Sequence, residues 1–194
     1  MKYYLIAGER SGDLHGSHLI KELKINDSEA QIRCWGGDLM EAAGGELVVH
    51  YRNLSFMGIW EVFKNLFTIK KYLDQCKQDL LEYQPDVVVL IDYPGFNLRI
   101  AEFAHHNRLK VCYFISPKLW AWNQKRAYKV KKYVDQMYAI LPFERQFYQQ
   151  YQYQVHYVGN PLVQTINDFT TPVSFSESLL HQNKPIVAVL PGSR

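Results

Sequence analysis

The sequence predicts an α/β protein with a Rossmann-like parallel sheet and helices on both faces. Short apolar runs alternate with stretches of helical period, and polar or glycine loops separate them. The clearest run, residues 86–91 after Pro85, contains five consecutive aliphatic residues, which is typical of a strand buried on both faces. Strands that alternate with helices are joined by right-handed crossovers, and these produce a parallel sheet.

The first part of the chain supplies three of the expected strands. Residues 3–7 form an apolar run that ends in a glycine loop, after which residues 14–23 keep helical spacing. Residues 31–35 form the second strand, which two glycines close, and residues 46–51 form the third. The pattern therefore predicts strand, helix, strand and strand in this order.

Three further strands and four helical segments follow. The strand at 86–91 is the strongest, the one at 109–115 repeats its pattern, and the one at 136–141 is weaker. Helical periods lie near 58–82, 97–107, 122–133 and 143–151. The alternation therefore continues through most of the chain.

The end of the chain has a different character. Residues 167–184 form a polar, linker-like stretch, and residues 185–194 have the pattern of a strand that leads into a glycine loop. We expect residues 1–166 to form an N-terminal Rossmann-like domain. Residues 185–194 are then the first strand and loop of a second, truncated α/β domain. The alternative is that this last strand joins the first sheet.

Composition limits the class of protein. The chain has 194 residues, of which 47% are hydrophobic and 21% charged, so it is globular and not disordered. A net charge of +3 is too small to indicate a nucleic-acid-binding protein. The cysteines, Cys34, Cys76 and Cys112, match no disulfide framework or metal site, which favours a reducing cytoplasm. No apolar run is long enough for a membrane span, and we expect no metal or cofactor.

Ligands of an open parallel sheet bind beyond the carboxyl ends of its strands, so the loops there hold the candidate site residues. The loop from Gly8 to Asp13 lets backbone N–H groups face a ligand at the start of a helix. Its spacing is neither that of a dinucleotide-binding loop nor that of a P-loop. Asp13 also suits a helix cap, and Glu9 also suits a solvated loop.

Asp92 follows the clearest strand and is the candidate general base. A carboxylate at the mouth of the crevice lies in a medium of low dielectric, which makes it basic enough to accept a proton near neutral pH. The alternative is a structural aspartate that caps the helix beginning near Asn97 or holds a neighbouring loop. The spacing leaves both interpretations open.

Three further segments suit ligands or membranes. Ser116 leads into Trp120 and Trp122, whose flat apolar surfaces suit sugar rings or acyl chains unless they pack under the next helix. Basic residues cluster over 118–132 and suit anionic headgroups or phosphates, unless they are only a solvated helix face. The helix at 56–73 is too apolar for one buried stripe, which suggests a second apolar surface against a membrane or an acyl chain.

Eight short motifs follow one another along the chain. They are Gly8-Glu9-x-Ser11-Gly12-Asp13, Gly36-Gly37-x-x-Met40, Met57-Gly58-x-x-Glu61-Val62, Ile91-Asp92-x-Pro94-x-Phe96-Asn97, Ser116-Pro117-x-x-Trp120-Ala121-Trp122, Pro142-Phe143-Glu144, Val158-Gly159-x-Pro161 and Leu190-Pro191-Gly192-Ser193-Arg194. In order and spacing they resemble the lipid-A-disaccharide synthases, a family of inverting glycosyltransferases of Gram-negative bacteria. The resemblance runs over the whole chain, and eight motifs in order are highly specific.

The resemblance implies the N-terminal domain of a GT-B-like fold, in which two Rossmann-like domains face a cleft. It implies transfer from UDP-2,3-diacylglucosamine to 2,3-diacylglucosamine 1-phosphate (lipid X), which gives a disaccharide 1-phosphate and UDP without a metal. It also implies a peripheral protein on the cytoplasmic face of the inner membrane. Family members are much longer than this chain, so we expect the fragment alone to be inactive.

The resemblance also assigns roles to residues. Asp92 is implied as the base that deprotonates the acceptor's 6-hydroxyl, Glu9 lies near the reacting sugars, and Arg194 stabilises the leaving diphosphate. Gly95 is a departure, because many members have a second acid there. The other residues implied in substrate binding are Ser11, Gly12, Asp13, Met57, Gly58, Asn97, Ser116, Trp120 and Trp122.

Two other functions stay open on the sequence. A UDP-sugar 2-epimerase-like enzyme shares the fold but has no need of an acyl-binding surface. A non-enzymatic lipid- or membrane-binding module is supported by the 56–73 helix and the basic cluster at 118–132.

Overall fold

The computed structural model describes residues 1–54, 66–167, 169–170, 187 and 189. The chain divides into two compact units, Met1–Asn160 and Pro161–Arg194. In the second unit the structure describes one helix, α9 (Leu162–Asn167).

Most of the predicted linker at 167–184 and of the predicted strand at 185–194 lies outside the described residues. The predicted boundary after residue 166 falls within α9. The assignment of residues 1–166 to one domain and of residues 185–194 to another therefore stays a prediction.

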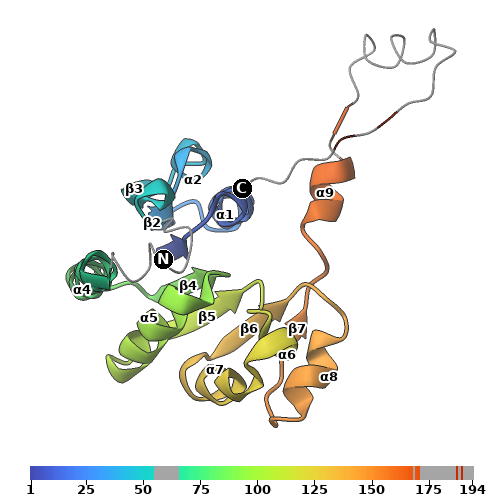
Figure 1. Ribbon diagram of the computed structural model, residues 1–194. Helices are drawn as coiled ribbons and strands as arrows, with labels where there is room; N and C mark the ends of the chain where they lie inside the picture. Colours follow the sequence, from blue (N-terminus) through green and yellow to red (C-terminus); the bar gives the residue numbers. More distant parts are fainter. Residues whose placement is uncertain (55–65, 168, 171–186, 188, 190–194) are drawn as a thin grey trace, which may run out of the picture. The chain divides into compact units, whose positions relative to one another are not determined.

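The first unit is built on a parallel sheet whose described strands have the order β3-β2-β1-β4-β5-β6-β7 (Figure 1). All six strands predicted within residues 1–166 are present, with ends at most two residues from those predicted, and the fold class is confirmed. The strand β7 has only two residues and shows no pattern in the sequence. The strands are β1 (Lys2–Ala7), β2 (Gln31–Gly36), β3 (Glu46–His50), β4 (Val87–Ile91), β5 (Lys110–Phe114), β6 (Gln136–Ala139) and β7 (His156–Tyr157).

The helices of this unit follow most of the predicted periods. They are α1 (Arg10–Asn26), α2 (Asp38–Ala42), the 3-10 turn η1 (Tyr51–Asn53), α4 (Leu66–Tyr83), α5 (Pro94–His106), α6 (Leu119–Trp122), the 3-10 turn η2 (Gln124–Arg126), α7 (Ala127–Tyr133) and α8 (Glu144–Gln149). The helical period predicted near 122–133 corresponds to η2 and α7, and Asn123 leaves the helical conformation between α6 and η2. Among the described residues, no helix combines the length and apolarity needed to cross a bilayer.

Side chains of β1, β4 and β5 alternate between two cores, as the pleat requires. Tyr4 and Ile6 of β1 join the larger core, which α4, α5 and α7 cover, whereas Leu5 and Ala7 join the core beneath α1 and α2. Figure 1 shows α1 and α2 on the opposite side of the sheet from α4, α5 and α7. The prediction of helices on both faces is therefore confirmed.

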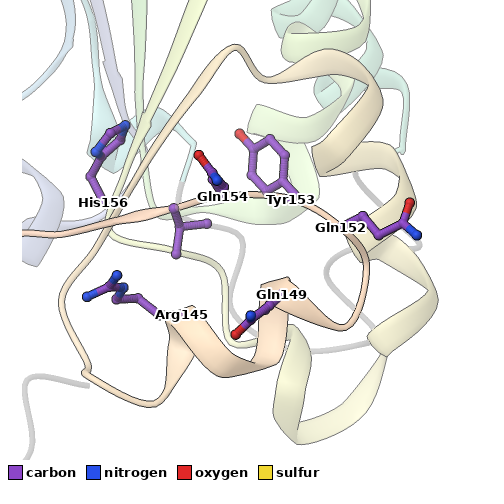
Figure 2. A pocket seen from close by; sticks show the side chains of 7 residues that line it. Arg145, Gln149, Gln152, Tyr153, Gln154 and His156 are labelled. Atoms are coloured by element: carbon purple, nitrogen blue, oxygen red, sulfur yellow. The ribbon is translucent and has the colours of Figure 1, made fainter.

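Among the described residues of this unit lie a groove and a second hollow. A groove of about 750 Å³ follows the sheet face beside α1, and its lining includes Leu19, Cys112 and Tyr138. A second hollow of about 630 Å³ lies beside α8 and β7, where Arg145 and His156 are among its polar lining residues (Figure 2). The linings of these two hollows include none of the predicted site residues.

Candidate functional site

The predicted loops of β1 and β4 meet at the point where the strand order reverses. These strands are neighbours in the sheet, while the chain runs from β1 to β2 and β3 on one side and from β4 to β7 on the other. Ala7 pairs with Ile91, so the loops that carry Glu9 and Asp92 leave the sheet at the same level. In open α/β sheets this switch point is where ligands bind. Both side chains are half-buried there.

The turn after β4 has a strained backbone. Asp92 has a φ of 44° and Tyr93 a φ of 48°, so two consecutive residues that are not glycine lie in the left-handed region. Such a conformation costs about 1–3 kcal/mol for each residue and persists only where surrounding contacts impose it. Strain of this kind gathers at functional sites, which sequence patterns do not show.

Three contacts hold the backbone of Asp92 in this conformation. Its N–H donates to the carbonyl of Phe114 over 3.1 Å. Its carbonyl accepts from the Asn97 side-chain amide at 2.8 Å and from the Tyr113 hydroxyl at 2.5 Å. Asn97 and Tyr113 are fully buried, and both of these bonds are partly buried. Asn97 therefore serves the backbone here, and its predicted contact with substrate stays a prediction.

Tyr93 joins the two loops, and the sequence pattern did not single it out. A Cβ atom on Gly8 would lie 2.2 Å from Cδ1 of the Tyr93 ring, so only glycine allows this approach. The Tyr93 hydroxyl donates to the carbonyl of Leu54 over 2.9 Å. Burial raises the pKa of Tyr93, and the negative charge of Glu9 raises it further. Glu9 thus lies close to the turn that carries Asp92.

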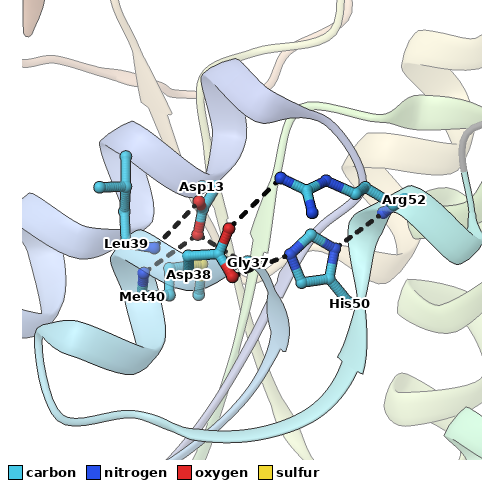
Figure 3. A network of polar contacts seen from close by, with 7 residues as sticks. All are labelled: Asp13, Gly37, Asp38, Leu39, Met40, His50 and Arg52. Atoms are coloured by element: carbon cyan, nitrogen blue, oxygen red, sulfur yellow. Dashed lines mark hydrogen bonds and ion pairs between the residues drawn. The ribbon is translucent and has the colours of Figure 1, made fainter.

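The carboxylate of Asp13 accepts hydrogen bonds from the backbone that follows β2. Its Oδ1 accepts from the backbone N–H groups of Gly37 and Met40 at 2.8 and 3.0 Å, and its Oδ2 accepts from that of Leu39 at 3.2 Å (Figure 3). The side chain is buried and caps α2 from α1 instead of capping its own helix. These three hydrogen bonds explain why the Asp13 carboxylate is buried without a bound substrate. The role of Asp13 in substrate binding stays a prediction.

The neighbours of Asp13 in the first loop differ in exposure. Gly12 is buried, and a Cβ atom there would lie 3.0 Å from that of Ala7, so Gly12 allows α1 to pack closely on β1. Ser11 is exposed and is available to a ligand. Glu9 occupies the N-cap position of α1, where its side chain makes no capping hydrogen bond.

A buried polar cluster lies beyond the ends of β5 and β6. The Ser116 hydroxyl lies 3.0 Å from the Tyr148 hydroxyl, and Glu144 Oε2 accepts from the N–H groups of Ile140 and Leu141 at 3.2 and 3.0 Å. Burial raises the pKa of the Glu144 carboxyl, an effect that these N–H groups and Ser116 oppose and that the charge of Asp92 increases. Glu144 was visible in the sequence only as part of its Pro-Phe-Glu motif.

The structure describes only some of the other predicted site residues. Trp120 packs edge-on against Phe143 with ring centroids 5.0 Å apart, and its indole nitrogen has no hydrogen-bond partner among the described residues. Trp122 ends α6, and nothing is described of its side chain. Met57, Gly58 and Arg194 lie outside the described residues. Within the described ranges, no group of three or more His, Cys, Asp and Glu residues is placed to hold a metal ion.

The structure describes part of the apolar segment and all of the basic stretch that were predicted to meet a membrane. Phe67, in the described part of the apolar segment, is 88% exposed, whereas Ile69 and Leu73 of α4 pack on the core. Residues 118–133 contain six of the 22 basic residues and none of the 19 acidic ones. Within this stretch Lys129 pairs with Glu102 at 3.3 Å, and Lys131 and Lys132 are exposed. The basic residues of this stretch therefore lie mainly on η2 and α7.

Solved structures with this fold include UDP-N-acetylglucosamine 2-epimerases. A putative enzyme of this kind from Listeria monocytogenes matches with a TM-score of 0.66 at 10% identity, over 90% of this chain and 50% of that one. The enzyme from Neisseria meningitidis bound to UDP-GlcNAc matches with a TM-score of 0.61 at 11% identity, over 93% of this chain and 53% of that one. At such identities the likeness shows the fold alone. The chain has the fold of the N-terminal Rossmann-like half of a GT-B-type protein.

Sequence relatives identify the family. The family model of Lipid-A-disaccharide synthetase matches residues 3–194. Lipid-A-disaccharide synthase 1 of Legionella pneumophila (strain Lens) is 40% identical over 192 residues, and the synthase of Coxiella burnetii (strain RSA 331 / Henzerling II) is 40% identical over 194 residues. Each match covers 98% of this chain but 50% and 51% of the relatives, so the chain spans about half their length. The chain belongs to the lipid-A-disaccharide synthetase family, as its motifs indicate.

Proposed function

We propose that the full-length protein is an inverting glycosyltransferase that joins UDP-2,3-diacylglucosamine to lipid X and releases UDP. Membership of the family supports this activity. The observation that carries the proposal is Asp92, half-buried at the switch point on a turn whose backbone is held by three hydrogen bonds. Residues 1–166 form the acceptor side, and residues 167–184 and 185–194 lead into the nucleotide-sugar domain.

In the proposed reaction, the Asp92 carboxylate accepts the proton of the acceptor's 6-hydroxyl. The oxygen attacks the anomeric carbon of the donor, the bond from that carbon to the diphosphate breaks, and UDP leaves with its negative charge. A single displacement inverts the anomeric centre. Glu9 accepts hydrogen bonds from sugar hydroxyls, and the guanidinium of Arg194 stabilises the leaving diphosphate.

The test is transfer by the full-length protein with Asp92 replaced by asparagine. Loss of a general base is expected to lower kcat by about 10²- to 10⁴-fold. Asp86→Asn is the matched control, because Asp86 precedes the same strand at its opposite end and accepts from the backbone N–H of Lys2. Asp92→Asn with a near-wild-type rate would exclude Asp92 as the base. We expect the 194-residue chain alone to be inactive, and turnover by it would contradict the proposed division of the site.

We also propose that the protein lies on the cytoplasmic face of the inner membrane. Exposed Phe67 and the basic residues of 118–133 support this proposal, because apolar side chains enter the headgroup region while lysines attract anionic lipids. Nothing in this arrangement favours a lipid-binding module over an enzyme with diacylated substrates. The enzyme is therefore the single function proposed.

Sedimentation with vesicles that contain anionic lipid tests this location. Reversal of Lys131 and Lys132 to glutamate is expected to weaken binding by at least about 2 kcal/mol, roughly 30-fold, since each lysine near such a surface contributes about 1 kcal/mol. Reversal of Lys21 and Lys110, which are also exposed but lie elsewhere in the chain, is the charge-matched control. Equal weakening by both pairs would show a general charge effect and contradict the proposed surface.

A further inference from the structure

Backbone strain is concentrated near Asp92 on two neighbouring strands. Six described residues other than glycine have a positive φ. Three of them follow the ends of helices, namely Gln84, Arg108 and Gln152. The other three follow the ends of β4 and β5, namely Asp92, Tyr93 and Ile115. Ile115 has a φ of 65°, which is a marked outlier for a β-branched residue. The exits of β4 and β5 are therefore strained side by side.

The exit of β5 is held by β6 and by α8. The Ile115 N–H donates to the carbonyl of Tyr138 over 3.1 Å. The next residue, Ser116, is buried, and its hydroxyl lies 3.0 Å from that of Tyr148, which is fully buried in α8. A buried hydroxyl pair fixes both side chains, because either group left unpaired would lose a hydrogen bond that water cannot replace.

The preceding turn of α8 holds the exit of β6 in a similar way. Glu144 lies four residues before Tyr148 and is 1% exposed. Its Oε2 accepts from the N–H groups of Ile140 and Leu141, the two residues that follow β6. The helix α8 therefore contacts the segments that follow β5 and β6 through two buried polar side chains.

From β5 the contacts continue to Asp92. Tyr113 and Phe114, the last residues of β5, bond to the carbonyl and the N–H of Asp92 respectively. Ile115 and Ser116 follow directly along the chain. These bonds therefore connect the exit of β5, which α8 contacts through Ser116, to the backbone of Asp92.

We propose that Tyr148 and Glu144 are positioning residues for Asp92, which they hold in its strained conformation through the exit of β5. This inference rests on the proposed function, because it assigns the carboxylate of Asp92 the role of base. A purely structural role for the same two side chains predicts a loss of stability without a specific loss of turnover. A positioning role predicts a loss of kcat in protein that is still folded.

The experiment compares three variants of the full-length protein. Tyr148→Phe removes only the hydroxyl, and Glu144→Gln keeps an oxygen that can accept from Ile140 and Leu141. Tyr83→Phe is the control, because its hydroxyl donates to the carbonyl of Gln31 over 3.0 Å at the opposite end of the strands. We expect kcat to fall about 10-fold or more in the first two variants, with KM unchanged and thermal unfolding still cooperative.

A pH profile separates the effect of the Glu144 charge on Asp92 from the effect of its hydrogen bonds. Burial and the charge of Asp92 raise the pKa of Glu144, so the two carboxyl groups interact. Removal of the Glu144 charge is expected to move the acid limb of kcat/KM to lower pH in Glu144→Gln. The same limb stays in place in the tyrosine variants.

Several outcomes would overturn the inference. One is that Tyr148→Phe and Glu144→Gln behave like Tyr83→Phe, and another is that only KM changes. If Tyr148→Phe does not fold, Ser116→Ala breaks the same contact from β5, and an unchanged kcat there has the same meaning. In a variant with both Ser116 and Tyr148 changed, additive losses would show that the two residues act separately, against the inference.

The proposed function and this inference can fail separately. Failure of the wild-type full-length protein to transfer sugar refutes the proposed function. In that case crystal structures of the same full-length variants decide the inference. It holds if the turn at Asp92 moves away from Tyr113 in Tyr148→Phe, and it is overturned if their hydrogen bond is unchanged. Activity lost in Asp92→Asn but kept in both α8 variants refutes the inference alone.

Discussion

The carboxylate of Asp13 is expected to be one of the largest single contributors to the stability of this fold. It is 2% exposed and accepts from the N–H groups of Gly37, Leu39 and Met40. A hydrogen bond to a charged acceptor contributes about 1.5–3 kcal/mol, and loss of a helix cap costs about 0.5–2 kcal/mol. Water can reach the N–H of Leu39 more easily, because that residue is exposed. We therefore expect Asp13→Ala to lower the free energy of unfolding by about 3–5 kcal/mol.

Asp13→Asn separates the geometry of the contact from its charge. The amide keeps one oxygen, which can still accept from Gly37 and Met40, but its NH₂ group then faces the N–H donor of Leu39. Two contacts become neutral and the third becomes repulsive. The expected loss is about 1–3 kcal/mol, between those of wild type and Asp13→Ala.

Urea unfolding followed by circular dichroism measures these differences. Asp38→Ala is the matched control, because Asp38 starts the same helix but is 69% exposed and pairs with the exposed Arg52 at 3.4 Å. Exposed ion pairs contribute little, so Asp38→Ala is expected to change the free energy of unfolding by less than about 1 kcal/mol. A loss in Asp13→Ala no larger than that in Asp38→Ala would refute the capping argument. Unchanged stability together with lost transfer would instead favour substrate binding by Asp13.

Three further predictions concern other parts of the first unit. Gly95→Ala in α5 is expected to raise the free energy of unfolding by about 0.5–1 kcal/mol in urea titrations, because the added Cβ meets no atom within 4 Å and glycine disfavours helix. Cys112 is expected to react first with a thiol reagent, while Cys34, whose pKa burial raises to about 12, and the buried Cys76 react only on unfolding. Burial raises the pKa of the Glu144 carboxyl in the folded state above 4.5. The stability of wild type relative to Glu144→Gln is therefore expected to fall as pH rises from about 4.5 through that raised pKa. Unfolding midpoints at several pH values measure this difference.

The sheet was predictable because its strands carry strong local signals. The run at β4 is buried on nearly all positions, and such a run between helical periods has few other interpretations. The missed elements are short: α2 has five residues and β7 has two, too few for a period to be recognised. The boundary between α6 and η2, at the start of the period predicted near 122–133, depends on the backbone of Asn123, which no periodicity reveals.

The site was predictable in outline but not in its contacts. Glu9 and Asp92 lie at the ends of neighbouring strands, as expected from the rule that ligands bind where a parallel sheet's strands end. The partners of Asp13 lie 24 to 27 residues away, so only the packing of α1 against the β2 loop brings them together. Tyr93, Tyr113 and Tyr148 act through hydroxyl groups whose partners no spacing rule specifies.

The geometry at Asp92 also explains why asparagine is the informative replacement there. Phe114, Asn97 and Tyr113 all bond to the backbone of Asp92, so a change in the side chain leaves these three contacts in place. Asparagine tolerates the left-handed region better than most residues, whereas alanine at a φ of 44° adds about 1 kcal/mol of strain. Asp92→Asn therefore removes the basic carboxylate while it keeps the turn. A loss of transfer in that variant, with unfolding unchanged, is attributable to chemistry at the carboxylate.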